Sequence, residues 1–364
     1  MLEVLYAVVL VAAVLAGYVL LLRFRVVAAS GSAAGDVCAI IPARNEQNSL
    51  PALLESLDRS TVPVRVLVID DASTDATVAR AREAGVEVIS PGTPPPGWTG
   101  KAWACHVGAN STDAELLLFL DADTVLASGA LGGIVDLHRR FGGLISVQPY
   151  HRVQRTYEQL SAYFNAVAVM ASGVFASGVG RRPMAFGPCL LTSRDDYERA
   201  GGHAAVRGEI LDDVELAAAY EKAGLPVYCV AGGSQIRMRS YPNGIRQLVA
   251  GWTKNMASGA AATDPRAGLA TGLWICAHHL VAVNTLLAMW TADEALATGI
   301  WLVAWVAFAL QLRVILRRVG SFRWWTWALF PLPLLAFDLL FAISTVNTLR
   351  GSVRWRGRTV RLGA

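Results

Sequence analysis

The chain has 364 residues, of which 54% are hydrophobic, and a formal net charge of +4. Its mean hydropathy of +0.41 is too high for a single soluble domain. The excess of apolar residues is concentrated towards the two ends of the chain. Arginines flank these apolar ends, so we expect contact with anionic lipid rather than with nucleic acid. Five cysteines lack the spacing of a metal site and are interpreted as buried thiols in a reducing compartment: Cys38, Cys105, Cys189, Cys229 and Cys276.

The first apolar segment covers residues 2–22 and carries one charge, Glu3. A helix of this length reaches roughly 31 Å, enough to cross the hydrocarbon core of a bilayer. The segment lacks the basic start of a signal peptide, and Arg23 and Arg25 follow it. We therefore expect a retained anchor over residues 1–25, with the following segment in the cytoplasm.

Strand-like and helix-like segments alternate after a short linker at 28–35. Apolar runs predict strands at 37–41, 64–69, 86–90 and 116–120. Helices are expected at 46–59, after Ser73 as a helix N-cap with Asp75 in the first turn, and after Lys101. This alternation with short links predicts an α/β fold with a mostly parallel sheet.

Polar side chains follow three of these strands: Arg44, Asn45 and Glu46 after Pro42, then Asp70 and Asp71, then Asp121 and Asp123. The ends of parallel strands meet at one edge of a sheet, where open α/β sheets bind ligands. Two acids one residue apart repel each other, so we expect Mg²⁺ or Mn²⁺ beside a diphosphate, with Lys101 neutralising phosphate charge. For the acid pair alone, a strand ending in a solvated turn is the alternative. Neither a P-loop nor a G-x-G-x-x-G motif is present.

Four short motifs follow the predicted elements: PARNE from Pro42, VIDDASTD from Val68, GK at Lys101 and DAD from Asp121. Together they resemble family 2 glycosyltransferases, over about residues 37–252. The resemblance implies a GT-A fold over 36–255, a nucleotide-diphosphate sugar donor and inversion of the anomeric centre.

The resemblance also implies roles for single residues. Asp71 would bind the nucleotide base, Asp121 the ribose or the metal, and Asp123 the metal. The other donor-binding candidates are Pro42, Arg44, Asn45, Glu46, Asp70 and Lys101. Asp213 stands where the family has its catalytic base. The family usually has Glu before that base, and this chain has Asp212, to which we assign a helix-capping or acceptor-positioning role.

The layout is most similar to membrane-attached members from hopanoid and carotenoid pathways, whose acceptors are lipids. Those members usually carry Lys where Arg356 stands. Processive synthases of the family carry Q-x-x-R-W, whereas the run from Gln247 to Trp252 lacks the arginine, which indicates one sugar per acceptor. Acceptor candidates are Gly187, His203, Trp252 and Lys254. The alternative for His203 is a structural role, and the alternative for Trp252 and Lys254 is anchoring at the membrane interface.

Two further spans are predicted at 268–290 and 295–316, joined by an acidic link with Asp293 and Glu294. A last apolar stretch, 324–345, contains Asp338, and a basic tail follows it. A mid-span Asp costs ~2.5–3.5 kcal/mol, and a span would place the basic tail outside. We therefore favour a broken, re-entrant or interfacial segment within a membrane region at 266–346, followed by the tail at 347–364.

Residues 157–179 carry one charge, Glu158, and also have the hydropathy of a span. A span here would put the acids at 121–123 and at 212–213 on opposite sides of the membrane. One active site needs both pairs, so we expect an amphipathic or buried helix near the membrane surface.

These patterns predict an inverting, metal-dependent hexosyltransferase, multi-pass in the plasma membrane with a cytoplasmic catalytic domain. Its partners would be a nucleotide sugar, most simply a UDP-sugar, and a lipid acceptor. Two alternatives stay open: a membrane-associated nucleotidyl or phospho-sugar transferase, and a non-catalytic module that binds nucleotide sugar or lipid. The sequence leaves the sugar, the lipid and the oligomeric state open.

Overall fold

The computed structural model describes residues 2–31, 35–177, 182–209, 211–291, 295–349, 352–355 and 358–361. The chain divides into two compact units. The sheet unit comprises Arg25–Tyr150 and Pro183–Arg239, and the helical unit comprises Met1–Phe24, His151–Arg182 and Ser240–Ala364. The predicted domain boundaries at 36–255 and 266–346 remain predictions.

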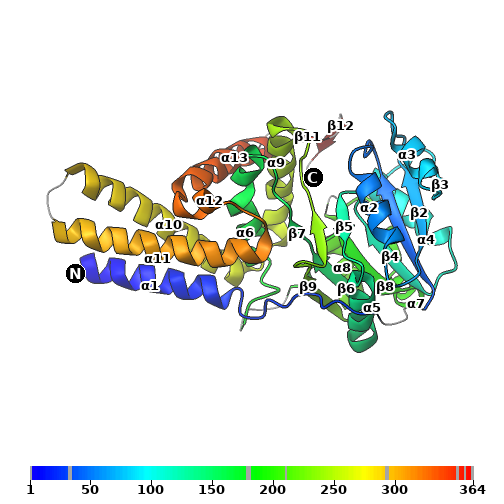
Figure 1. The fold of residues 1–364 in the computed structure, drawn as a ribbon, viewed down its shortest axis with the longest axis horizontal. Helices are drawn as coiled ribbons and strands as arrows, with labels where there is room; N and C mark the ends of the chain where they lie inside the picture. Colours follow the sequence, from blue (N-terminus) through cyan, green and yellow to red (C-terminus); the bar gives the residue numbers. More distant parts are fainter. Residues whose placement is uncertain are drawn as a thin grey trace. The chain divides into compact units, whose positions relative to one another are not determined.

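A seven-stranded sheet in the order β3-β2-β1-β4-β8-β6-β9 forms the sheet unit (Figure 1). Its first four strands are parallel, β8 is antiparallel to both neighbours, and β6 and β9 are parallel. The predicted α/β fold with a mostly parallel sheet is confirmed. The strands are β1 (Val37–Ala43), β2 (Arg65–Asp70), β3 (Glu87–Ile89), β4 (Leu116–Leu120), β6 (Leu144–Gln148), β8 (Cys189–Ser193) and β9 (Val227–Ala231).

Side chains of the central strands alternate between two hydrophobic cores. In β4, Leu118 belongs to a core shared with α2 and α5, whereas Phe119 belongs to a core shared with α4, α7 and α8. A strand's period of two therefore aims the residue after next, Asp121, towards the α4 and α8 side. The helices are α2 (Leu50–Asp58), α3 (Thr77–Glu83), α4 (Gly100–Asn110), α5 (Ala130–Phe141), α7 (Arg194–Arg199) and α8 (Asp212–Lys222).

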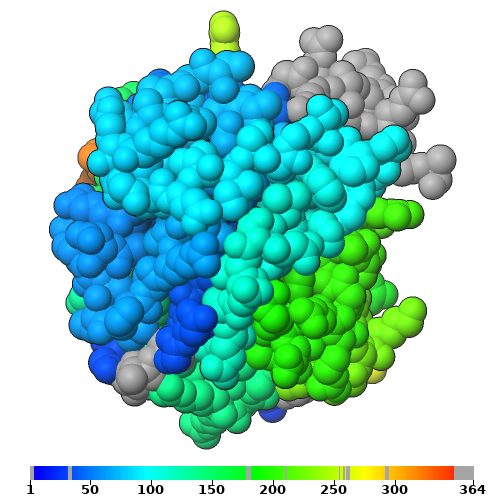
Figure 2. Space-filling model, turned by 90° about the vertical axis from the view of Figure 1, so that its right-hand side faces the viewer, coloured from blue at the N-terminus to red at the C-terminus, as the bar shows by residue number. Residues whose placement is uncertain are grey.

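Two smaller features complete this unit. A three-stranded sheet has the order β5-β10-β7 and comprises β5 (Thr124–Leu126), β10 (Ile236–Met238) and β7 (Tyr150–His151). The short helix η2 (Gly202–Ala204) packs against α4. The two segments lie side by side on the face shown in Figure 2, α4 in cyan and η2 in green.

Two predictions about helix starts are wrong. The helix expected from residue 46 begins at Leu50, because Asn45 has a φ of 56° and the Glu46 N–H donates to Thr77 Oγ1 (2.7 Å). Ser73 does not cap α3, whose N-cap is Ala76. Its hydroxyl instead accepts the Asn45 N–H (2.9 Å), so the loops after β1 and β2 are joined to each other.

The helical unit contains two helices long and apolar enough to cross a membrane, α10 (Pro265–Thr291) and α11 (Ala295–Val319). They coincide with the two predicted spans, whereas Asp293 and Glu294 lie outside the described residues. The N-terminal helix α1 (Leu2–Val19) has 18 residues and ends before residue 22. The other elements are η1 (Tyr157–Ser161), α6 (Ala162–Ala171), α9 (Ile245–Ala262), α12 (Trp324–Ala328), α13 (Pro331–Leu349), β11 (Ser352–Trp355) and β12 (Arg358–Arg361).

Neither of the two ambiguous apolar stretches forms one continuous helix. Residues 324–345 break between α12 and α13, so the predicted break is confirmed. Residues 157–177 form η1 and α6, and α6 has only 10 residues, most of them buried. Residues 178 and 179 lie outside the described part, as do Arg356 and much of the tail.

Polar side chains join the apolar helices of this unit. Gln311 donates to the Val14 carbonyl (2.6 Å) and accepts from the Trp274 indole N–H (2.9 Å). Asp338 pairs with His279 across α13 and α10 (2.8 Å), which gives the acid in the last apolar stretch a partner. The five cysteines are all free thiols, but Cys276 is exposed and Cys229 is only partly buried, so the prediction that all five are buried is wrong for these two.

Replacing Gly108 by Ala tests the packing of α4 on the sheet. An added Cβ would lie 2.4 Å from Ile40 Cγ2 and 3.0 Å from Ile69 Cγ1. We expect overpacking of ~1–3 kcal/mol to outweigh the helix-propensity gain of ~1 kcal/mol. Thermal unfolding of the full chain in detergent should therefore show a lower Tm.

The same change at Gly259 in α9 is the control, because no atom of the described residues lies within 4 Å of its added Cβ. Gly259→Ala should leave the Tm unchanged or raise it slightly. An equal effect at both positions would contradict the packing described for α4.

Candidate active site

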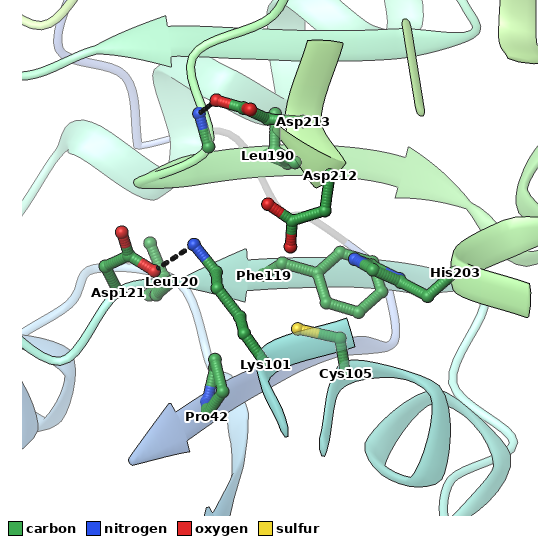
Figure 3. Close-up of a pocket in the computed structure, with 11 residues that line it drawn as sticks. Pro42, Lys101, Cys105, Phe119, Leu120, Asp121, Leu190, His203, Asp212 and Asp213 are labelled. Atoms are coloured by element: carbon green, nitrogen blue, oxygen red, sulfur yellow. Dashed lines mark hydrogen bonds and ion pairs between the residues drawn. The ribbon is translucent and has the colours of Figure 1, made fainter. Parts of the chain in front are cut away.

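A narrow cavity opens at the C-terminal ends of β1 and β4 (Figure 3). From the predicted donor set it brings together Pro42, Lys101 and Asp121, and from the predicted acceptor side Gly187, His203, Asp212 and Asp213. These residues come from six segments of the sheet unit. The cavity has a volume of about 10 Å³, roughly that of one water.

The Lys101 ammonium is the cation of this cavity. Its Nζ lies 2.7 Å from Asp121 Oδ1, and the two side chains are 40% and 29% exposed. Loss of water acts to lower the pKa of Lys101, but the charges of Asp121 and Asp212 together outweigh this and hold it well above its ordinary value. Lys101 therefore stays charged, able to exchange a carboxylate partner for a phosphate.

Asp213 is held at the start of α8 by two backbone amides. Its Oδ2 accepts the Gly187 N–H (2.8 Å) and its Oδ1 accepts the Val214 N–H (3.0 Å). Burial and the neighbouring charge of Asp212 raise the pKa of Asp213 to about 6, against the opposing effects of Lys101 and the two amides. Such a carboxylate is ionised at neutral pH and is more basic than an ordinary one.

Gly187 has a positional reason to be glycine. A Cβ at this position would lie 3.0 Å from Asp213 Oδ2 and 3.2 Å from Asp213 Cβ. The Gly187 backbone thus donates to the Asp213 carboxylate, and the missing side chain leaves room for that carboxylate.

Asp212 does not cap α8. The N-cap is Leu211, without a side-chain hydrogen bond, so the capping alternative for Asp212 is wrong. The residue is 9% exposed, and its carboxylate lies in the cavity (Figure 3). Its negative charge contributes to the raised pKa values of both Lys101 and Asp213.

The remaining donor-binding candidates lie outside the cavity lining. Arg44 pairs with Asp71 (3.3 Å), whose carboxylate also lies against Gly100, where an added Cβ would be 2.4 Å from Oδ2. Asn45 Oδ1 accepts the Thr74 N–H (2.8 Å). Asp70 Oδ2 accepts the Ser73 N–H (3.3 Å), whereas its buried Oδ1 has no hydrogen-bond partner within the described ranges. In this structure the side chains of Asn45 and Asp70 therefore hold the two loops.

His203 is buried and held by Tyr197. The Tyr197 hydroxyl accepts the His203 backbone N–H (3.0 Å) and lies 2.9 Å from Nδ1. Burial lowers the pKa of His203 to about 3, so the ring is neutral. The histidine therefore combines the two predicted readings, since it is a packed residue that also lines the cavity.

Trp252 belongs to the helical unit, whereas the cavity residues belong to the sheet unit. It is 8% exposed, donates its indole N–H to Ser161 Oγ (2.9 Å), and stacks on Phe164 with centroids 4.7 Å apart. These contacts favour a packing role. The side chain of Lys254 lies outside the described part of the structure.

Sequence comparisons agree with this geometry. The model of glycosyl transferase family 2 matches residues 38–198. A 4,4'-diaponeurosporenoate glycosyltransferase of Staphylococcus aureus (strain MRSA252) is 35% identical over 326 residues, covering 88% of this chain and 86% of its own. The corresponding protein of strain bovine RF122 / ET3-1 has the same identity and coverage. The chain belongs to glycosyl transferase family 2.

A solved structure shows the same fold. It is described as the mannosyltransferase PcManGT from Pyrobaculum calidifontis in complex with GDP-Man and Mn²⁺. The match covers 96% of each chain, with a TM-score of 0.53 and 18% identity. The predicted GT-A-like fold is thereby confirmed. The family match and the Staphylococcus aureus relative confirm the assignment as a glycosyltransferase, and the two alternative function classes are set aside.

The donor atoms of this glycosyltransferase fit a hard divalent ion only in part. Asp121 and Asp123 offer carboxylate oxygens one residue apart, the kind of ligand that Mg²⁺ and Mn²⁺ prefer. Within the described ranges, no three His, Cys, Asp or Glu side chains are grouped closely enough to hold a metal. The pair Asp121 and Asp123 therefore fits a divalent ion whose other ligands come from a bound diphosphate.

Four residues of the cavity lining were not predicted as site residues, namely Cys105, Phe119, Leu120 and Leu190, and neither was Tyr197, which holds His203. Cys105 lies in the cavity one helical turn after Lys101, and Phe119 lines it two residues before Asp121. The helical period from Lys101 could have predicted Cys105, and the strand period of two from Asp121 could have predicted Phe119. Tyr197 could not be found in this way, because its contact with His203 depends on the turn at Gly201, which has a φ of 80°.

Replacing Lys101 by Met tests the electrostatics of the cavity. The ammonium lowers the pKa of Asp213, so its removal should raise that pKa above about 6. If Asp213 must be ionised, the acidic limb of the kcat/KM profile should shift to higher pH. Lys101→Arg keeps the charge and should keep the limb in place. If the acidic limb of the kcat/KM profile did not shift in Lys101→Met, the charge of Lys101 would not control the pKa of Asp213.

Proposed function

We propose that this protein transfers a single hexose from a UDP-sugar to an apolar lipid, with inversion of the anomeric centre. The observation that carries the proposal is the position of Asp213. A carboxylate with a pKa of about 6 shares one cavity with the Lys101–Asp121 ion pair. A base and a phosphate-binding cation are the two groups that such a transfer requires.

The donor would bind at the ends of β1, β2 and β4. In the proposal Lys101 turns from Asp121 to the diphosphate, while Asp71 contacts the base and Asp121 the ribose or the metal. Pro42, Arg44, Asn45, Glu46 and Asp70 shape the loops around it. Asp121 and Asp123 would hold Mg²⁺ or Mn²⁺, which, when bound, neutralises charge on the departing diphosphate.

Asp213 would act as the general base. Its ionised carboxylate takes the proton of the acceptor hydroxyl, or orients an acceptor that is already an ionised carboxylate. The acceptor oxygen then forms a bond to the anomeric carbon on the face opposite the diphosphate. The bond between that carbon and the diphosphate oxygen breaks, and UDP leaves with the electron pair. Asp212, Gly187 and His203 would line the acceptor side.

The acceptor class rests on the relatives and on the apolar helices. The name of the Staphylococcus aureus relative specifies a diaponeurosporenoate acceptor, and α10 and α11 are long enough to cross a bilayer. A carotenoid-like, hopanoid-like or glycerolipid-like acceptor at the cytoplasmic face of the plasma membrane fits both. The cytoplasmic placement rests on Arg23 and Arg25 after α1.

Incubation of the full chain with UDP-glucose and membranes tests the reaction. Release of UDP together with a glycosylated lipid, identified by mass spectrometry, would support the proposal. Release of UMP with a sugar phosphate on the lipid would contradict it, because that product requires cleavage of a phosphorus–oxygen bond.

Asp213→Asn should lower kcat by roughly 10²–10⁴-fold, the usual contribution of a general base to acceptor deprotonation. The amide preserves the shape but not the basicity, so donor binding should change little. Asp212→Asn is the matched control and should cost less. If Asp212→Asn lost turnover while Asp213→Asn kept it, the two roles would be exchanged.

The wild-type enzyme should gain activity as pH rises through about 6, because Asp213 must lose its proton to act as the base. The acidic limb of kcat/KM, measured with saturating metal, checks this. Activity that rose as the pH fell below 6 would rule out Asp213 as an ionised base.

Chelation tests the metal proposal. Activity should vanish in EDTA and return on addition of Mg²⁺ or Mn²⁺, because a diphosphate needs its leaving charge neutralised. Full turnover in excess chelator would show that Lys101 and the loop amides suffice without an ion.

A further inference from the structure

A second cavity lies within the helical unit, between α9 and α13, with a volume of about 480 Å³. This lies within the range of ~300–1,000 Å³ typical of small-molecule sites. Its apolar lining comes from Ile245, Val249, Ala250 and Ile343. We call this cavity the α9–α13 groove.

The polar lining of the groove comes from Arg246, Thr253 and Asn347. The Thr253 hydroxyl donates to the Val249 carbonyl within α9, and the Thr253 carbonyl accepts from Ser344 Oγ of α13 (2.9 Å). The Thr253 hydroxyl is thus used within α9, and the Thr253 carbonyl is used to join α9 to α13. Arg246 is exposed, and in the part of the chain that the structure describes no hydrogen bond or ion pair satisfies its guanidinium. The groove therefore combines an apolar slot with one uncompensated cation.

The N-terminal end of α9, which carries Arg246, is firmly held. The Tyr157 hydroxyl donates to the Tyr241 carbonyl (2.8 Å) and accepts the Gly244 N–H (3.0 Å). The Asn243 N–H donates to Gln247 Oε1 (2.8 Å). These bonds hold the backbone at the start of α9, so the position from which the Arg246 side chain extends beside the apolar slot is set before any ligand binds.

We infer that the α9–α13 groove holds one acyl chain of an anionic phospholipid, with the lipid phosphate against Arg246. The chain matches the apolar walls, and a guanidinium binds phosphate through paired N–H groups. The groove also stands next to a membrane candidate in sequence, because α9 ends at Ala262 and α10 begins at Pro265. A zwitterionic lipid has no net negative charge, so it would not neutralise the positive charge of Arg246.

Lipid binding to the full-length protein in detergent tests this inference by native mass spectrometry. The probes are dioleoyl phosphatidylglycerol, dioleoyl phosphatidylcholine and oleic acid. We expect phosphatidylglycerol to bind about fivefold more tightly than phosphatidylcholine, the effect of one cation on an anionic lipid. Arg246→Gln should abolish this preference, and Ala250→Phe, which fills the groove, should weaken binding of both phospholipids.

Arg266→Gln is the matched control. Arg266 is also exposed and lies in α10, outside the groove lining, so its loss should leave the preference unchanged. Equal binding of the two phospholipids by the wild type, or a preference that survives Arg246→Gln, would overturn the inference. Displacement of phosphatidylglycerol by equimolar oleic acid would also overturn it, by assigning the groove to a long-chain carboxylic acid.

Discussion

One ammonium group compensates three carboxylates in the active site. Asp121, Asp212 and Asp213 surround a narrow cavity, and Lys101 is the cation within it, paired directly with Asp121. Carboxylates this close repel each other strongly away from bulk water. Lys101 lowers the cost of gathering them, and the two amides on Asp213 lower it further. The residual repulsion leaves Asp213 more basic than a solvated carboxylate, which is useful in a base.

The fold positions this cluster with ordinary packing. The period of two in β4 points Phe119 and then Asp121 towards the core that contains α4 and α8. The Thr99 side chain caps α4 through the Ala102 N–H, which sets the first turn from which Lys101 extends. The antiparallel strand β8 brings Gly187 next to β4. A parallel sheet alone would not supply the amide that holds Asp213.

The helical unit meets a different constraint, because polar groups on apolar helices need partners. Gln311 satisfies Val14 and Trp274, and Asp338 pairs with His279. Each contact joins two helices distant in sequence, so the polar groups fix helix packing. Arg246 differs because no residue that the structure describes forms a hydrogen bond or ion pair with its guanidinium. An enzyme proposed to act on a lipid thus carries a cation beside an apolar slot in the unit that contains its long apolar helices.

The sequence by itself determined the mostly parallel sheet, the strand-end acids and the two long apolar helices. All of these depend on periodicity or run length over a few neighbouring residues. The folded chain alone reveals that α2 starts at Leu50, that Leu211 rather than Asp212 is the N-cap of α8, and that Gly187 holds Asp213. The first and the last of these rest on contacts between residues more than 20 positions apart, Glu46 with Thr77 and Gly187 with Asp213. Local patterns carry no information about such contacts, because the same side chains satisfy their hydrogen bonds equally well within a helix cap or across two loops.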